Sequence, residues 1–274
     1  MLLEGVRNLM TSVRIYQRNK SGRKFEPEAP YMKDCVNPGD ICLHFGGSDG
    51  RHSYLLADWV GPEGHVHVYE PSNYSYKILT RLLRWHGLKN VTPHNLAIGA
   101  ERGHMILSVP VKLSGHLGRA YGVVTQSGQS ASEELLATGN SSEFVDQETD
   151  VVSLDNVMED ENLDRVDFIR CDIEGAEVNF IKGGKATIEK HLPSILIEIH
   201  PFSVQSNFGS TPEEVRDYFI GLGYRMWQLN DDDTEMFEST EIDPKRRWKD
   251  YFLIHPSRAD SLPDGMFKDA LKAS

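Results

Sequence analysis

Acidic side chains and a histidine follow two apolar runs in the second half of the chain. Asp172 and Glu174 close the run VDFIRCDIE, and Glu198 and His200 close the run SILIEIHP. Because side chains alternate along a strand, the two members of each pair share a face. Buried charge must be paired or ligated. The two pairs therefore indicate proton transfer or the binding of a hard divalent cation.

Three of these groups allow two chemical arrangements. Asp172, Glu198 and His200 could hold a divalent ion such as Mg²⁺, which would lower the pKa of a bound hydroxyl. Without a metal, His200 could act as the base and a carboxylate could orient it, because histidine titrates near neutral pH. Both arrangements stay open, and we expect the metal-free one.

Other acids nearby have a structural alternative. Glu177 is expected to cap a helix N-terminus, and Asp155 in SLDNV is also expected to be a helix cap. Glu174 fits a cap and a chemical role equally well.

A glycine-rich turn lies early in the chain. The segment from Gly46 to Gly50 reads GGSDG and follows the apolar run ICLHF. Glycines at the end of a strand let the backbone approach a ligand closely. The adjacent Gly46 and Gly47 do not fit the G-x-G-x-x-G spacing of a pyrophosphate site. Glu70 ends the next apolar run, about 20 residues later, where a carboxylate can accept hydrogen bonds from ribose hydroxyls. The pattern favours a nucleoside without a pyrophosphate, such as S-adenosylmethionine.

A parallel sheet would bring these groups to one edge. Apolar runs alternate with helical patterns, and Thr211–Glu214 reads as a capping box. The expected strands lie near 41–45, 65–71, 91–99, 166–174, 194–201, 224–229 and 250–254. This alternation predicts an α/β fold with a mostly parallel seven-stranded sheet and helices on both faces.

The chain divides into three expected parts. Residues 1–34 read as a helix and a basic linker, residues 35–256 as the main domain, and residues 257–274 as a tail. The first helix is expected to dock on the domain surface rather than to anchor a membrane or partner. The Ser- and Gly-rich stretch 111–148 interrupts the domain, and we expect a substrate lid there rather than a plain surface loop.

Composition narrows the function further. The 274 residues carry a formal net charge of −12, which argues against a nucleic-acid partner because phosphate contacts need a basic surface. No apolar run reaches the about 18 residues of a membrane span. Cys35, Cys42 and Cys171 show no metal-ligand spacing, and a cytoplasmic location fits them best. Nothing in the sequence sets the oligomeric state.

Several segments in order resemble the FkbM family of S-adenosylmethionine-dependent methyltransferases. They lie between residues 35 and 201 and read LHFGGSDGRHS, GPEGHVHVYEP, HNLAIG, VVSLDNV, DFIRCDIEGAE and ILIEIHP. DIEGAE followed by EIHP is the most specific part. The resemblance implies a Rossmann-like class I methyltransferase fold with S-adenosylmethionine as cofactor.

The resemblance also implies roles for individual residues. Gly46, Gly47, Ser48 and Gly50 would surround the methionine part, Glu70 would hold the ribose, Asn95 and Ala97 would flank the adenine, and Asp172 would lie beside the methyl group. The family usually has an aspartate where this chain has His44. A neutral imidazole can accept one hydrogen bond but adds no counter-charge. His44 is equally well explained as a packed strand residue.

We expect an O-methyltransferase that acts on a hydroxyl of a sugar, glycan or other natural product. Alignment supplies much of the catalysis in such a displacement, but a hydroxyl also needs a base or a metal ion. An N-methyltransferase of the same fold is the alternative. Because of His44, a degenerate S-adenosylmethionine-binding interaction protein stays a further alternative. A nicotinamide dehydrogenase is a weaker option.

Overall fold

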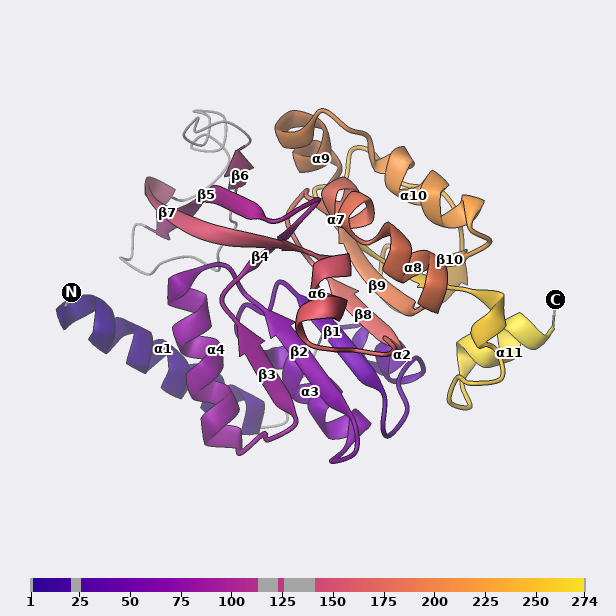
Figure 1. Cartoon of the computed structure of the whole chain (residues 1–274), viewed down its shortest axis with the longest axis horizontal. Coiled ribbons are helices and arrows are strands. Elements are labelled where there is room, and N and C mark those ends of the chain that lie inside the picture. Colours follow the sequence, from indigo (N-terminus) through magenta and orange to yellow (C-terminus); the bar gives the residue numbers. More distant parts are fainter. Residues whose placement is uncertain (1, 21–25, 113–122, 126–140, 274) are drawn as a thin grey trace.

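An eight-stranded sheet forms the centre of the computed structural model, which describes residues 2–20, 26–112, 123–125 and 141–273. Helices cover both faces of the sheet (Figure 1). The strand order is β11-β10-β12-β9-β8-β1-β2-β3. The strands are β1 (Ile41–Phe45), β2 (His65–Tyr69), β3 (Val91–His94), β8 (Phe168–Cys171), β9 (Ser194–Ile199), β10 (Arg225–Leu229), β11 (Met236–Glu238) and β12 (Lys249–Ile254).

Five neighbouring strands, from β3 through β2, β1 and β8 to β9, are parallel, and β12, β10 and β11 continue the sheet antiparallel. The predicted α/β fold with helices on both faces is confirmed. The predicted strand count was wrong by one. Strand β11 has three residues, too few for a hydrophobic period to show in the sequence.

A second sheet interrupts the doubly wound pattern. It has the order β4-β7-β5-β6 and consists of β4 (Ala97–Gly99), β5 (Gly103–Lys112), β6 (Val123–Thr125) and β7 (Ser141–Ser153). The predicted third strand, 91–99, is therefore two strands that belong to different sheets. Strands β5 and β7 pair antiparallel from Gly103 with Val151 to Lys112 with Ser141, and we call this pair the ribbon.

The expected insertion 111–148 begins and ends within the ribbon. Residues 113–122 and 126–140 of the insertion lie outside the described residues, so the lid stays a prediction. Gln147 joins the ribbon to the loop after β2. Its Nε2 donates to the carbonyl of Pro71 at 2.8 Å, and its Oε1 accepts from the backbone N–H of Asn73 at 2.9 Å.

Two hydrophobic cores lie against the sheet, one on each face. Leu43 and Phe45 of β1 enter one core and Cys42 enters the other, as strand alternation requires. The first core is covered by α6 (Leu154–Asp160), α7 (Glu177–Gly183), α8 (Lys185–His191) and α10 (Pro212–Gly221). The second is covered by α2 (Ala29–Lys33), α3 (Arg51–Val60), α4 (Asn73–His86) and α11 (Met266–Lys272).

Local signals set several helix ends as the sequence predicts. The Ser72 side chain accepts from the N–H of Ser75 at the start of α4, and Gly87 ends that helix in the left-handed region with φ of 70°. Thr211 and Glu214 form the predicted capping box of α10. Helix α9 (Pro201–Phe208) begins directly after His200.

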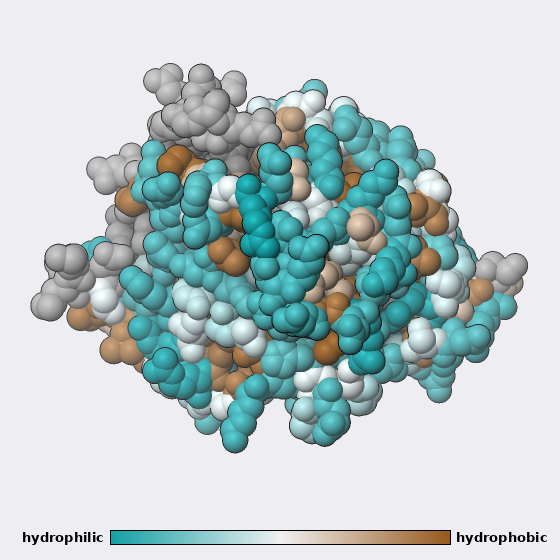
Figure 2. All heavy atoms as spheres, in the orientation of Figure 1, coloured by the Kyte–Doolittle hydropathy of each residue, from teal (hydrophilic) through white to brown (hydrophobic). Residues whose placement is uncertain are grey.

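Helix α1 (Leu2–Lys20) lies against α4 through polar contacts. The buried Asn8 and Ser12 both accept hydrogen bonds from Arg81 Nη1 at 2.6 Å. Hydrophilic residues cover most of the molecular face drawn in Figure 2. Within the described ranges, no helix combines the length and the apolar character that a membrane crossing requires.

Candidate active site

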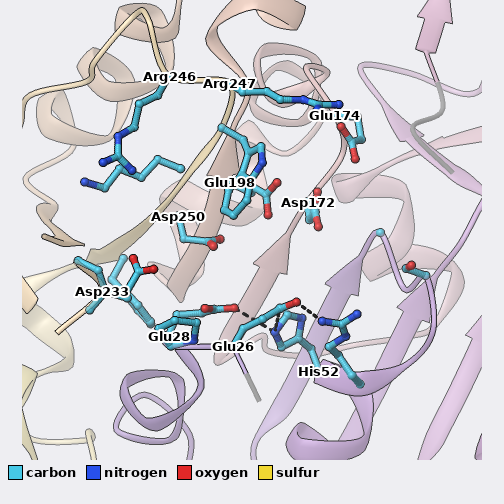
Figure 3. Close-up of a pocket in the computed structure, with 18 of the residues that line it drawn as sticks. Glu26, Glu28, His52, Asp172, Glu174, Glu198, Asp233, Arg246, Arg247 and Asp250 are labelled. Atoms are coloured by element: carbon cyan, nitrogen blue, oxygen red, sulfur yellow. Dashed lines mark hydrogen bonds and ion pairs between the residues drawn. The ribbon is translucent and has the colours of Figure 1, made fainter. Parts of the chain in front are cut away.

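A cavity of about 510 Å³ opens beyond the carboxyl ends of β1 and β8, and Figure 3 shows its charged lining. A smaller cleft of about 60 Å³ lies beside it and is lined mainly by apolar residues. The two spaces share Gly46, Glu70, Asp172 and Glu174. All four were singled out in the sequence, so the predicted residues converge at the junction of the two spaces.

The glycine loop lies tightly against the neighbouring strand ends. Gly46 has φ of +86°, and a Cβ there would lie 1.9 Å from the backbone oxygen of Asp172. The N–H groups of Gly46 and Gly47 both donate to the carbonyl of Tyr69, at 3.0 and 2.9 Å. Only glycine fits this approach, so the loop is fixed between the ends of β2 and β8.

Glu70 joins two loops of the site. Its Oε2 accepts from the N–H of Ser48 at 2.6 Å, and its Oε1 accepts from the N–H of Ser72 at 2.8 Å. Burial raises the pKa of Glu70 to about 7, although these hydrogen bonds act in the opposite direction. A carboxylate has about four acceptor positions, so about two remain for a ligand.

The small cleft lies beyond Glu70. Ala97 lines it together with Tyr69 and Leu96. Asn95 instead stabilises the loop after β2, because its Nδ2 donates to the carbonyls of Glu70 and Pro71 at 2.9 and 3.0 Å. Small-molecule pockets usually measure about 300–1,000 Å³. A nucleoside would therefore enter this cleft only if its walls moved apart.

His44 lies under the glycine loop and lines neither space. Its Nδ1 is 2.7 Å from the hydroxyl of Ser53 on α3. Burial, together with the neighbouring His52, lowers the pKa of His44 well below its ordinary value. The imidazole is therefore neutral and brings no charge to the site.

Arg170 occupies the centre of a buried acidic cluster. Its side chain is 1% exposed, and its guanidinium lies 3.1 Å from Glu198 Oε2, 3.1 Å from Asp250 Oδ1 and 3.6 Å from Asp172 Oδ2. A buried arginine must be paired, and these three carboxylates pair it. The cation therefore neutralises part of the acidic charge at the ends of β8 and β9.

His200 contacts the same cluster from the end of β9. Its Nε2 lies 2.8 Å from Glu198 Oε1 and 3.9 Å from Asp172 Oδ1, and its Nδ1 lies 3.4 Å from Glu174 Oε2. Burial alone would lower the pKa of His200, but the carboxylates raise it well above its ordinary value. The structure thus brings together Asp172, Glu198 and His200, and the imidazole carries a proton at neutral pH.

Glu174 faces both spaces. It has φ of +55°, a left-handed conformation that is uncommon for residues other than glycine. Burial raises its pKa to about 8, against the effect of His200. Glu177 instead accepts a hydrogen bond from the N–H of Gly175 at 3.0 Å and lies in the first turn of α7. Asp155 accepts from the N–H of Thr187 in the first turn of α8.

A second acidic group lies on the opposite wall of the large cavity (Figure 3). His52 Nε2 lies 3.1 Å from Glu26 Oε2 and 3.2 Å from Glu28 Oε1. Burial lowers the pKa of His52, but the two carboxylates outweigh it and raise the pKa to about 9. The imidazole is therefore charged, and acidic side chains outnumber basic ones around the cavity.

The family model for the methyltransferase FkbM domain matches residues 40–226. The chain belongs to the FkbM methyltransferase family. The members of this family are S-adenosylmethionine-dependent methyltransferases. No curated protein matches it in sequence.

Solved structures similar to this chain include two described as methyltransferases and a fibrillarin. The methyltransferase FkbM of Methylobacillus flagellatus KT is 14% identical with a TM-score of 0.47, and the match covers 89% of this chain and 59% of that one. Aeropyrum pernix fibrillarin with natively bound S-adenosylmethionine is 12% identical, with a TM-score of 0.46 and coverage of 83% and 73%. A Thermotoga maritima S-adenosylmethionine-dependent O-methyltransferase is 13% identical, with a TM-score of 0.40 and coverage of 85% and 66%.

The FkbM site fits S-adenosylmethionine in its donor set. Glu70, a buried carboxylate with free acceptor positions, lies beside a glycine loop in which Gly46 has no room for a Cβ. Asp172 Oδ1 is buried and accepts no hydrogen bond, although His200 Nε2 lies 3.9 Å from it. A carboxylate oxygen of this kind can accept a hydrogen bond from a cationic ligand group.

Sequence reasoning missed several charged residues of the site, among them Arg170, Asp250, Glu26, Glu28 and His52. A lone arginine in the apolar run DFIRC was a usable signal for Arg170, because a buried arginine needs carboxylates. Asp250 reaches the cluster through the antiparallel pairing of β12 with β9. Glu26 and Glu28 meet His52 only in the fold, and no spacing rule links them.

Proposed function

We propose that this FkbM protein transfers the methyl group of S-adenosylmethionine to a hydroxyl of a sugar, glycan or other natural product. The proposal rests mainly on Glu174, which borders both spaces and has its pKa raised to about 8. A general base works best when its pKa lies near the working pH. Glu174 would therefore take the proton of the acceptor hydroxyl.

The cofactor would lie across the small cleft and the glycine loop, once the walls of the cleft have moved apart. When bound, it supplies an electrophilic methyl group on a positively charged sulfur. Glu70 would accept hydrogen bonds from the ribose hydroxyls, and Ala97 would contact the adenine. Asp172, whose Oδ1 accepts no hydrogen bond, would face the cationic end of the cofactor. The acceptor would then enter from the large cavity, on the other side of Asp172 and Glu174.

His200 supports the base instead of replacing it. An imidazolium has no free lone pair, so it cannot accept the proton from the acceptor. It lies 3.4 Å from Glu174 and 2.8 Å from Glu198, which suits it to orient these carboxylates. We therefore assign proton acceptance to Glu174 and positioning to His200.

The contacts also support the metal-free alternative. The oxygens of Asp172 and Glu198 that face Arg170 already have a cationic partner. A protonated His200 cannot ligate a metal until it loses that proton. Asp172, Glu174 and His200 do have potential ligand atoms within 4.8 Å of one another. Binding of Mg²⁺ at these groups is therefore kept as an outcome of the test.

The acidic lining favours a second candidate function. Carboxylates on both walls, including Glu26, Glu28 and Asp233, create a negative potential that attracts cations. An amine acceptor would enter as a cation and lose its proton to Glu174. N-methylation is therefore the alternative to O-methylation.

Two further proposals concern the surroundings of the protein. The net charge of −12 supports an acceptor other than nucleic acid, although solved structures with a similar fold include two described as rRNA methylases. The buried, free Cys35, Cys42 and Cys171 support a reducing compartment such as the cytoplasm.

The test is methyl transfer from labelled S-adenosylmethionine to a panel of sugars, glycosylated metabolites and amines. We expect label on a hydroxyl, and label on amines alone would replace O-methylation by N-methylation. Adding Mg²⁺ to exhaustively chelated protein should not raise turnover. Loss of turnover that Mg²⁺ restores would overturn the metal-free mechanism.

A further inference from the structure

A further cluster of ligand-type side chains lines neither space of the active site. His67 on β2, His94 at the end of β3 and Glu161 at the end of α6 meet on the sheet face that α6 covers. His67 Nδ1 lies 3.4 Å from Glu161 Oε2 and 3.4 Å from His94 Nε2. His94 Nδ1 lies 3.6 Å from Glu161 Oε1.

We propose that His67, His94 and Glu161 bind a transition-metal ion, with Zn²⁺ as the best match. Two imidazole nitrogens and one carboxylate oxygen are ligands that Zn²⁺ prefers. In a tetrahedral site with bonds of 2.0–2.1 Å, neighbouring ligand atoms lie about 3.4 Å apart. The ligand atoms of this cluster all lie within 4.8 Å of one another, so small side-chain rotations complete the geometry.

The two histidines are already in the form that binds metals. Burial lowers the pKa of His67 to about 4, helped by the neighbouring His65 and His94. Burial also lowers the pKa of His94, although Glu161 acts in the opposite direction. Neutral imidazoles need lose no proton before they ligate an ion. The side chain of Glu161 is 26% exposed, which gives the ion a route to the site and leaves room for a water ligand.

The cluster contacts Tyr69, a residue that lines the cofactor cleft. The ring of Tyr69 stacks on His94 with centroids 4.4 Å apart and planes inclined by 9°. Tyr69 lines the small cleft, and its carbonyl accepts from both N–H groups of the glycine loop. An ion that fixes His94 would therefore also hold Tyr69 in place, and its role would be structural.

The test starts from full-length protein freed of metal by chelation. Zn²⁺ binding is measured by calorimetry, and Co²⁺ is added as a coloured substitute. We expect one tight equivalent of Zn²⁺ in the wild type and at least a tenfold weaker Kd in His67→Gln and Glu161→Gln. His65→Gln is the matched control, because its ring lies 4.8 Å from that of His67 but outside the cluster. This control should bind Zn²⁺ as the wild type does.

X-ray absorption on the wild type keeps the proposal testable if a variant fails to fold. We expect two imidazole ligands on the bound Zn²⁺. Each of the two other possible metal clusters among the described residues offers a single imidazole. One consists of Glu26, Glu28 and His52, and the other of Asp172, Glu174 and His200. One imidazole, no tight binding, or equal binding in all variants would overturn the proposal. S-adenosylmethionine binding, measured on the same metal-free protein, reports separately on the methyltransferase site.

Discussion

Replacing Glu70 with alanine should weaken S-adenosylmethionine binding by a factor of about 10 to 150. Two backbone N–H groups already occupy acceptor positions of the Glu70 carboxylate, and about two positions remain for ribose hydroxyls. A hydrogen bond to a charged group contributes about 1.5–3 kcal/mol, and each 1.4 kcal/mol is about tenfold in Kd. The tenfold weakening corresponds to the loss of a single weak hydrogen bond.

The affinity should also depend on pH, because burial raises the pKa of Glu70 to about 7. Ribose hydroxyls donate to the ionised carboxylate, so binding favours the deprotonated form. Binding should therefore weaken as the pH falls from 8 to 6, by at most about tenfold per pH unit below the pKa. Glu70→Gln removes this titration. The amino group of the ligand titrates equally in both proteins, so the ratio of their Kd values reports Glu70 alone.

The assay is calorimetry with S-adenosylmethionine between pH 6 and pH 8. Glu70→Ala also leaves the N–H groups of Ser48 and Ser72 without a partner, which costs about 1–3 kcal/mol each, so circular dichroism must show that the variant is folded. Glu63→Ala, in the exposed turn before β2, is the matched control. A folded Glu70→Ala protein that binds as tightly as this control would refute the ribose assignment.

Other predictions address the acidic cluster and the glycine loop. Glu174→Gln should lower kcat by at least about 10²-fold and abolish a rise of kcat/KM with pH centred near 8, while calorimetry finds S-adenosylmethionine affinity unchanged; an unaltered pH profile would place the base elsewhere. Arg170→Met should lower the free energy of unfolding in urea by about 3–5 kcal/mol at pH 7, because Glu198 and Asp250 lose their cation. Burial already raises the pKa of Asp250 and Arg170 acts against it, so without Arg170 this pKa rises further and the loss should shrink towards pH 5; a loss below about 1 kcal/mol would contradict the buried pairing. Gly46→Ala should cost more than about 2 kcal/mol of stability in the same assay, because its Cβ would meet a backbone oxygen at 1.9 Å.

Local signals made part of the molecule predictable. Ser72 and Gly87 bracket helix α4, and each acts within a few residues of the helix end it forms. Glu70 and Asp172 end apolar runs, and parallel strands carry such residues to a common edge. Their convergence on the glycine loop could therefore be predicted without coordinates.

The rest of the site depends on pairings between distant segments. Asp250 reaches Arg170 because β12 joins β9 antiparallel, and nothing local in the sequence fixes that edge. The protonated state of His200 depends on several carboxylates at once, which residue types alone do not determine. The sequence therefore predicted His200 as the base of the metal-free arrangement, whereas our proposal assigns that role to Glu174.

The hydrogen bonds of Gln147 have a consequence for the cooperativity between cofactor and acceptor. They attach the ribbon to Pro71 and Asn73, directly after the proposed ribose acid. A cofactor that orders this loop then restricts the ribbon to fewer positions. Linkage between two binding sites is reciprocal. A molecule that holds the ribbon in that position therefore raises the affinity for the cofactor, and the cofactor raises the affinity for that molecule by the same factor. An acceptor that touches the ribbon would therefore bind cooperatively with S-adenosylmethionine, and S-adenosylhomocysteine, which keeps the ribose, would retain that cooperativity after methyl transfer.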